Sequence, residues 1–112
     1  MKSQNIINVA QDFTSTPGAR YKTDGQYSGE EFREKFIEPL FANFEDNSEI
    51  VIVLDGLVGQ PTSFLEESFG GMARIAGVER CLKRFRFVSK EDRLVVEEIL
   101  SYIKSAKKKP PR

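Results

Sequence analysis

The sequence predicts a single α/β domain, with about three helices packed on a mixed four-stranded sheet that includes an N-terminal hairpin. A length of 112 residues is near the usual size of one domain. Residues 50–54, Ile-Val-Ile-Val-Leu, form a continuous apolar run, which is typical of a strand covered on both faces. Three capping signals, each followed by helically spaced apolar residues, predict the helices. We expect the domain to occupy residues 1–106 and the basic residues 107–112 to form a disordered tail.

The predicted hairpin lies near the N-terminus. Residues 6–9 are apolar and partly β-branched, which is typical of a strand, and Asp12 marks a bend or bulge after them. The Thr-Pro-Gly sequence at residues 16–18 has the residue order of a type II turn. Residues 19–22 are therefore expected to return as a second, antiparallel strand.

The first helix is predicted to begin at Ser28, because Glu31 follows at the spacing of a capping box. Pro39 lies inside the helical pattern. It lacks the N–H that would bond to the carbonyl of Lys35, and its ring crowds that carbonyl. The helix is therefore expected to kink or break close to Glu38.

The second half of the chain predicts two more helices and one more strand. Ser63 and Glu66 repeat the capping-box spacing, and Gly77 is the expected C-cap of the helix that begins there. Arginine and phenylalanine alternate over residues 84–87, which indicates a half-buried strand nearer the sheet edge. Ser89 then caps a third helix.

Composition limits the classes of function. Lysine plus arginine and aspartate plus glutamate both number 17, so no overall field draws the chain to nucleic acid or to an anionic membrane. The longest apolar run has five residues, too few to cross a bilayer, and the N-terminus lacks the apolar core of a signal peptide. The single cysteine, Cys81, is typical of a reducing compartment. These observations predict a cytoplasmic protein.

Histidine is absent, which excludes hydrolases with a histidine base and zinc sites built from histidine and cysteine. An enzyme would have to use carboxylate, Lys, Arg, Tyr, Ser or Thr chemistry, with a hard cation such as magnesium as one option. We predict no catalytic residue, metal or cofactor, and we favour a non-catalytic protein while leaving the enzymatic alternative open.

The start of the second helix is one candidate site. Asp55 and glycines follow the central strand, and Thr62 and Ser63 lie at the helix N-terminus, a layout that can hold phosphate. The segment fails the P-loop template, since Pro61 and Thr62 stand where glycine and lysine are needed. Plain capping and turn formation is the alternative interpretation.

A second candidate site is a polar cluster near the predicted hairpin end and the start of the first helix. Its members are Arg20, Tyr21, Ser28, Glu30 and Arg33, to which Asp55 and Glu67 are added if the loops converge on one pocket. Ion pairs that only lock a loop are the alternative. Asp55, Glu66 and Glu67 have the oxygen ligands that a magnesium site needs, but capping and a solvated helix face explain these carboxylates more simply.

Gly70 and Gly71 lie inside the second predicted helix, where each glycine costs about 1 kcal/mol relative to alanine. Close packing of the helix on the sheet is the favoured explanation. The alternative is a smooth surface on which a partner lies, with Phe64, Gly70 and Gly71 as its candidate residues.

Four segments together resemble a known family: Pro-Gly-Ala-Arg-Tyr at residues 17–21, Ser-Gly-Glu-Glu-Phe-Arg at 28–33, Leu-Asp-Gly at 54–56 and Ser-Phe-Leu-Glu-Glu-Ser-Phe-Gly-Gly at 63–71. They are similar to the STAS-like domain family of unknown function, over roughly residues 6–77. The broader resemblance is to STAS domains, of which the anti-sigma-factor antagonists are the best understood.

This resemblance implies a mixed sheet with helices on one side and a role in partner switching. The antagonists bind a histidine-kinase-like ATPase that phosphorylates a serine at the N-terminus of the helix after a central strand. Ser63 or Thr62 would occupy that place here. The antagonists carry an Asp-Ser-Ser-Gly-type sequence there, whereas residues 61–64 of this chain are Pro-Thr-Ser-Phe.

Three hypotheses follow. The leading one is a non-catalytic regulatory protein-interaction module that binds a protein, with a histidine-kinase-like ATPase as the implied partner. The second is a small enzyme or a nucleotide- or phosphate-binding domain that uses the polar cluster. The third is a self-associating domain, because nine phenylalanines in a short chain can provide an oligomer face.

Overall fold

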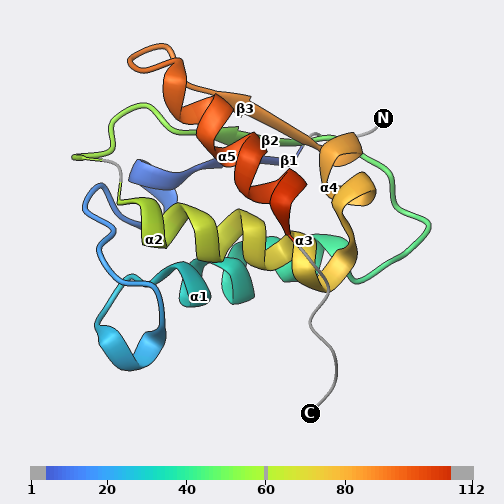
Figure 1. The fold of residues 1–112 in the computed structure, drawn as a ribbon, viewed down its shortest axis with the longest axis horizontal. Helices are drawn as coiled ribbons and strands as arrows, with labels where there is room; N and C mark the ends of the chain where they lie inside the picture. Colours follow the sequence, from blue (N-terminus) through green and yellow to red (C-terminus); the bar gives the residue numbers. More distant parts are fainter. Residues whose placement is uncertain (1–4, 60, 107–112) are drawn as a thin grey trace.

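The computed structural model describes residues 5–59 and 61–106, and its sheet has three parallel strands. The strands are β1 (Asn5–Asn8), β2 (Ile50–Val53) and β3 (Phe85–Val88), in the spatial order β1-β2-β3 (Figure 1). The predictions of a first strand, a central strand and a late edge strand are therefore confirmed. The tail at residues 107–112 lies outside the described residues.

The predicted hairpin and the fourth, antiparallel strand are wrong. Residues after β1 turn immediately into the π-helical turn η1 (Val9–Phe13). The Asn8 side chain accepts a hydrogen bond from the Gln11 amide at 3.1 Å, and Asp12 accepts one from the Asn8 amide at 2.8 Å. Such local side-chain hydrogen bonds compete with strand pairing. Of the expected second strand, only an isolated bridge between Ala19 and Ser28 is present among the described residues, and η2 (Lys22–Asp24) follows.

The first crossover contains α1 (Gly29–Phe32), the π-helical turn η3 (Arg33–Ile37) and the 3₁₀ turn η4 (Glu38–Phe41). The predicted cap is confirmed, because the Ser28 hydroxyl accepts a hydrogen bond from the Glu31 amide at 3.0 Å. The predicted break is also confirmed. The helical type changes at Glu38, immediately before Pro39, because proline cannot donate the hydrogen bond that would continue the helix.

The second crossover begins with a helical segment at residues 62–76. It comprises α2 (Thr62–Leu65), the π-helical turn η5 (Glu66–Gly70) and α3 (Gly71–Ala76). Ser63 is not the N-cap as predicted. Pro61 takes that position with an extended backbone, and its carbonyl accepts from the Leu65 amide at 3.2 Å. Gly77 ends α3 with a φ of 105°, which confirms the predicted C-cap.

Two further helices complete the fold, and one of them was not predicted. α4 (Val78–Arg84) follows Gly77 directly and leads into β3. The expected last helix is α5 (Leu94–Ser105), but Ser89 is not its N-cap as predicted. The N-cap is Arg93, and Asp92 accepts a hydrogen bond from the Leu94 amide at 3.0 Å. None of the helices within residues 5–59 and 61–106 combines the length and apolarity needed to cross a membrane.

The helices cover one face of the sheet, with α1, α2 and α3 forming a layer beside the strands (Figure 1). Ile50 and Ile52 are fully buried, whereas Val51 and Val53 between them are half-buried and Ile6 is 57% exposed. The prediction that the central strand is covered on both faces is therefore wrong. A continuous apolar run does not distinguish these cases, because valine is also common on a partly exposed sheet face.

Phenylalanines fill the space between the sheet and the helices. Eight of the nine lie in the core or pack against it, and ring pairs such as Phe32–Phe64 and Phe69–Phe85 have centroids 5.7 and 5.5 Å apart. Such pairs stabilise a core beyond their buried area. Phe44 is the exception, since 80% of it is exposed. The phenylalanine content is therefore explained mainly by the core.

Candidate functional site

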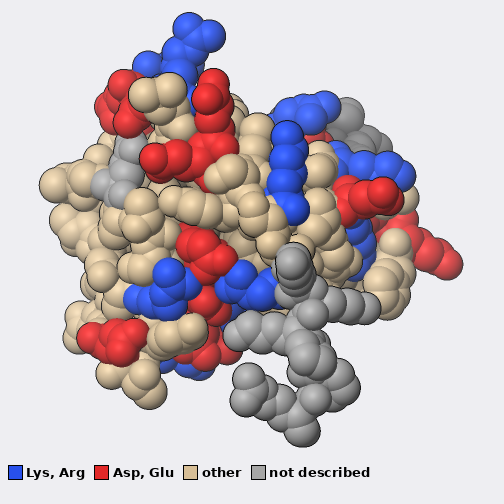
Figure 2. Space-filling view, viewed as in Figure 1, with Lys and Arg blue, Asp and Glu red and all other residues tan. Residues whose placement is uncertain are grey.

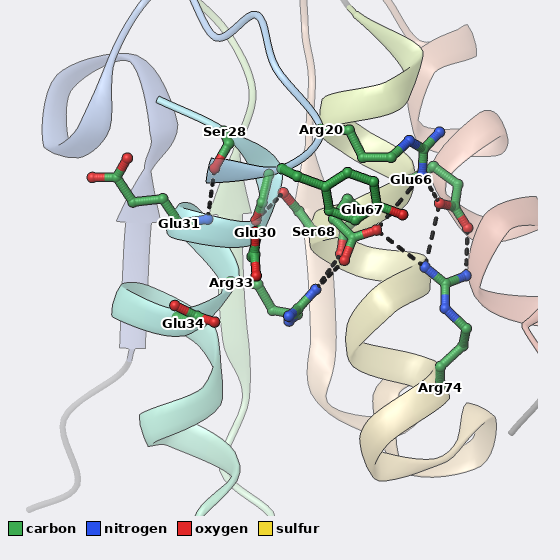
Figure 3. Close-up of polar contacts among 12 residues, drawn as sticks. Arg20, Ser28, Glu30, Glu31, Arg33, Glu34, Glu66, Glu67, Ser68 and Arg74 are labelled. Carbon is green, nitrogen blue, oxygen red and sulfur yellow. Dashed lines mark hydrogen bonds and ion pairs between the residues drawn. The ribbon is translucent and has the colours of Figure 1, made fainter. Parts of the chain in front are cut away.

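Three segments that are distant in the sequence bring five charged side chains together in what we term the Arg–Glu network (Figure 3). Arg20 comes from the loop before η2, Arg33 from the start of η3, and the rest from the helical segment 62–76. The network consists of Arg20, Arg33, Glu66, Glu67 and Arg74.

Glu67 and Arg33 form the most buried pair of the network. Their side chains are 9% and 11% exposed, and Arg33 Nη1 lies 2.5 Å from Glu67 Oε2. The same nitrogen donates to the Glu67 carbonyl at 3.3 Å, and Arg33 Nε donates to Glu38 at 2.8 Å. Arg33 therefore joins the first crossover to the second through charge-assisted hydrogen bonds.

Glu66 bridges the other two arginines. Arg20 Nη1 lies 2.5 Å from Glu66 Oε1, and Arg74 Nη1 lies 2.6 Å from Glu66 Oε2. Both arginines also approach Glu67, at 3.6 Å from Arg20 and 3.5 Å from Arg74. The two glutamates are thus held between three arginines, and no negative charge in this group is left without a cation beside it.

The π-helical turn η5 and two glycines allow this arrangement. The wider turn begins at Glu66, and an added Cβ at position 71 would lie 2.8 Å from Arg33 Nη1. At position 70 it would lie 2.8 Å from Glu66 Oε2. Both glycines do allow close packing, but the prediction that they pack against the sheet is wrong, because charged side chains are the nearest groups at both positions. π-helical turns are often found at functional sites.

The partner surface that we considered at the same positions is corrected. Phe64 is fully buried, and Gly70 and Gly71 are buried as well. They lie inside the fold because Phe64 belongs to the aromatic core and the glycines face the ion pairs.

The pKa values of Glu66 and Arg33 are shifted in the direction that favours their charged forms. The hydrogen bond from Arg74 lowers the pKa of Glu66, burial opposes this shift, and Arg20 adds to it. Burial acts to lower the pKa of Arg33, but hydrogen bonds with Glu38 and Glu67 raise it overall. A carboxylate held ionised by guanidinium groups is a poor proton donor. The geometry therefore suits fastening of helices better than acid–base catalysis.

A small cavity of about 240 Å³ opens beside the network. Its lining residues are Tyr21, Arg33, Glu67, Gly71, Arg74 and Ile75. Tyr21 is 42% exposed. Four residues of the predicted polar cluster, Arg20, Tyr21, Arg33 and Glu67, therefore lie together. Sequence reasoning did not include Arg74, and it assigned Glu66 to capping.

The remaining predicted members lie elsewhere. Ser28 is buried and caps α1, while Glu30 accepts a hydrogen bond from the Lys22 amide at 2.9 Å. Asp55 accepts from the Glu91 amide at 2.8 Å and fastens the loop before α5. This bond, with a second from the Lys90 amide, lowers the pKa of Asp55. The single pocket that would unite all seven residues is therefore not formed.

The carboxylates considered for magnesium are separated, because Asp55 binds the loop before α5 whereas Glu66 and Glu67 bind arginines. Across residues 5–59 and 61–106, no three Asp, Glu, Cys or His side chains gather in a way that would hold a metal ion. On the face shown in Figure 2, basic and acidic side chains lie in small interleaved groups separated by uncharged surface.

The matching family model is described as a STAS-like domain of unknown function (DUF4325), and it covers residues 28–93. The chain therefore belongs to this family, as the four sequence segments predicted. No curated protein and no solved structure matches the chain.

Proposed function

We propose that the chain is a non-catalytic regulatory domain that binds a partner protein through the N-terminal end of α2. The position of Thr62 and Ser63 carries this proposal, because both lie in the first turn of the helical segment that follows the central strand. Thr62 is exposed and Ser63 half-buried. The N-cap is Pro61, which makes no side-chain hydrogen bond, so capping the helix uses neither hydroxyl.

Phosphorylation of Ser63 or Thr62 is the regulatory step of this proposal. The γ-phosphoryl group of ATP would move to the side-chain oxygen, ADP would leave, and the hydroxyl proton would pass to a base of the kinase. Free amides and the helix dipole stabilise a phosphate at a helix N-terminus. The same phosphate adds about −1.5 to −2 charge to the surface at the start of α2. It would therefore weaken docking of a partner there while preserving the fold.

The partner class rests on the family relationship. STAS domains of the antagonist type bind a histidine-kinase-like ATPase, and we propose a partner of this kind here. The Arg–Glu network supports a non-catalytic role, because its carboxylates are already paired with arginines.

The test combines mass spectrometry with quantitative capture from an extract of the source organism. Wild type and Ser63→Ala are expected to capture equal amounts of an ATPase of this class, whereas Ser63→Glu captures at least about tenfold less. The corresponding Thr62 variants are measured in the same way. Peptide mass spectrometry is expected to find phosphate on Ser63 or Thr62.

A matched control is Ser101→Glu, which adds the same charge at an exposed position on α5. It is expected to capture the partner like wild type. Circular dichroism checks that every variant is folded. Equal capture by all variants, or a chain that acquires no phosphate and captures no ATPase, would count against the proposal.

A further inference from the structure

A second surface, which we term the Phe44 groove, lies beside the corner between α3 and α4. Two adjoining cavities of about 380 and 510 Å³ share Phe44, Ala76, Gly77 and Arg80. Phe44 comes from the loop between η4 and β2, and Ile75 lines the smaller cavity. Phe44 is 80% and Ile75 53% exposed. An exposed aromatic ring next to an exposed aliphatic side chain is typical of a contact surface.

Arg80 gives the groove a cationic group without a matching anion. Its guanidinium lies 4.7 Å from the ring centroid of Phe44 and 5.1 Å from that of Phe41. One nitrogen donates to the Asn43 carbonyl at 2.8 Å. The Nε atom is buried and has no hydrogen-bond partner among the described residues. Since a guanidinium has five N–H donors, most of its capacity is unused, and a buried donor without an acceptor is unusual.

The charges around Arg80 favour an acidic ligand. Glu38 lines the smaller cavity but already binds Arg33 at 2.8 Å, and Glu79 and Lys83 line the larger one. Neither Arg80 nor Lys83 forms an ion pair with a carboxylate in the part of the chain that the structure describes. Because Glu38 is already paired, the groove has two positive side chains, Arg80 and Lys83, and one remaining carboxylate, Glu79. Its lining therefore carries an excess of positive charge.

We propose that the Phe44 groove binds an acidic, amphipathic peptide segment of a partner protein. An apolar side chain of the peptide packs against Phe44 and Ile75, and a neighbouring carboxylate binds Arg80 with help from Lys83. Arginine between aromatic rings is pre-organised for this role, because little side-chain freedom is lost when the carboxylate arrives. This surface goes beyond the proposed function, since it includes neither Thr62 nor Ser63.

The test titrates the full-length ¹⁵N-labelled chain with 4-phenylbutyrate, which joins one apolar ring to one carboxylate. The neutral 4-phenylbutyramide is the matched probe. Amide signals of the Phe44 groove are expected to shift, with carboxylate binding at least about threefold tighter than the amide. Arg80→Gln is expected to lower the affinity for 4-phenylbutyrate to that for 4-phenylbutyramide. Phe44→Ser is expected to lower the affinity for both probes.

Two further variants and one measurement make the outcome decisive. Lys83→Gln, at an exposed position, is expected to weaken binding of 4-phenylbutyrate only. Lys90→Gln removes a cation outside the groove and is expected to leave the affinity for both probes unchanged. Equal affinity for the two probes, or shifts confined to other surfaces, would overturn the proposal. A concentration-dependent dimer that Phe44→Ser abolishes in sedimentation would also overturn it, because a second copy would then occupy the groove. Capture of the ATPase by Ser63 variants is unaffected by either result, so the two proposals fail separately.

Discussion

Replacing Arg33 with methionine tests whether the Arg–Glu network holds the two crossovers together. The variant keeps an aliphatic stem of similar length but removes the bonds at 2.5 Å to the Glu67 carboxylate and at 3.3 Å to its carbonyl. Glu67 is left 9% exposed, with its nearest remaining cations 3.5 and 3.6 Å away. Its charge is then buried without a close partner.

The expected cost follows from this burial. Breaking a buried ion pair by removing one partner typically costs about 3–5 kcal/mol. The two remaining arginines compensate in part, so we expect a loss of about 2–3 kcal/mol in the free energy of unfolding. Far-UV circular dichroism during urea denaturation measures it, since the chain has no tryptophan. With a slope of about 1–3 kcal/mol per molar urea, this loss lowers the urea midpoint by roughly 0.7–3 M.

A double variant separates pairing from loss of packing. The stability loss of Arg33→Met combined with Glu67→Met is expected to be smaller than the sum of the two single losses by at least about 1 kcal/mol, because no unpaired buried charge remains. Lys22→Met is the control, since it removes an exposed ion pair with Glu34 at 2.6 Å and is expected to unfold like wild type. A loss below about 0.5 kcal/mol for Arg33→Met, or strictly additive losses, would refute the reasoning.

Three further results are expected. The pKa of Glu66 in the folded chain is lowered from an ordinary value near 4.5, so Glu66 stabilises the fold above that pH and loses this contribution as the pH falls through the lowered value. In urea denaturation between about pH 3 and 7, the free energy of unfolding of Arg74→Gln should depend less on pH than that of wild type. Burial raises the pKa of Cys81 to about 12, so a thiol reagent at pH 8 should react at least about a thousandfold faster in urea than with the native chain. Gly29→Ala should cost about 1–3 kcal/mol, because the new Cβ would lie 2.6 Å from the Phe64 carbonyl oxygen, whereas Gly18→Ala has nothing within 4 Å and should cost nothing.

The parts of the fold that could be predicted are those with a local physical cause. Ser28 caps α1 because its hydroxyl reaches an amide three residues later, and Gly77 ends α3 because it tolerates a positive φ. Pro39 ends regular hydrogen bonding for an equally local reason. These residues carry their structural consequence within one helical turn, so one sequence suffices.

The hairpin could not be predicted correctly because only some of the contacts that prevent it are local. Residues 9–13 contain strand-forming side chains. However, the ring centroid of Phe13 lies 5.3 Å from that of Phe32 and 5.6 Å from that of Phe36. This packing and the Asn8 cap favour the π-helical turn over a strand. The prediction of Ser63 as the N-cap is wrong for a similar reason. The capping-box spacing is present, but the Glu66 carboxylate forms ion pairs with Arg20 and Arg74 instead.

The candidate site was half predicted. Arg20 and Arg33 were identified because polar residues crowd a short stretch, whereas the sequence pattern did not single out Arg74. Its role depends on a wider helical turn that brings it to Glu66, eight residues away, at 2.6 Å. A regular α-helix places residues eight apart on adjoining faces more than 10 Å apart along the axis, so spacing alone gave no signal.

The position of the network makes Arg33→Met informative about function as well as stability. Thr62 begins and Ala76 ends the helical segment that the network fastens at its middle, and these ends are about 20 Å apart at 1.5 Å per residue. If the network only supports the fold, partner capture by Arg33→Met should fall in proportion to the folded fraction and recover at lower temperature. Loss of capture by a fully folded variant would instead make the cavity beside Tyr21 a binding site. Capture measured alongside circular dichroism at two temperatures therefore decides between support and recognition.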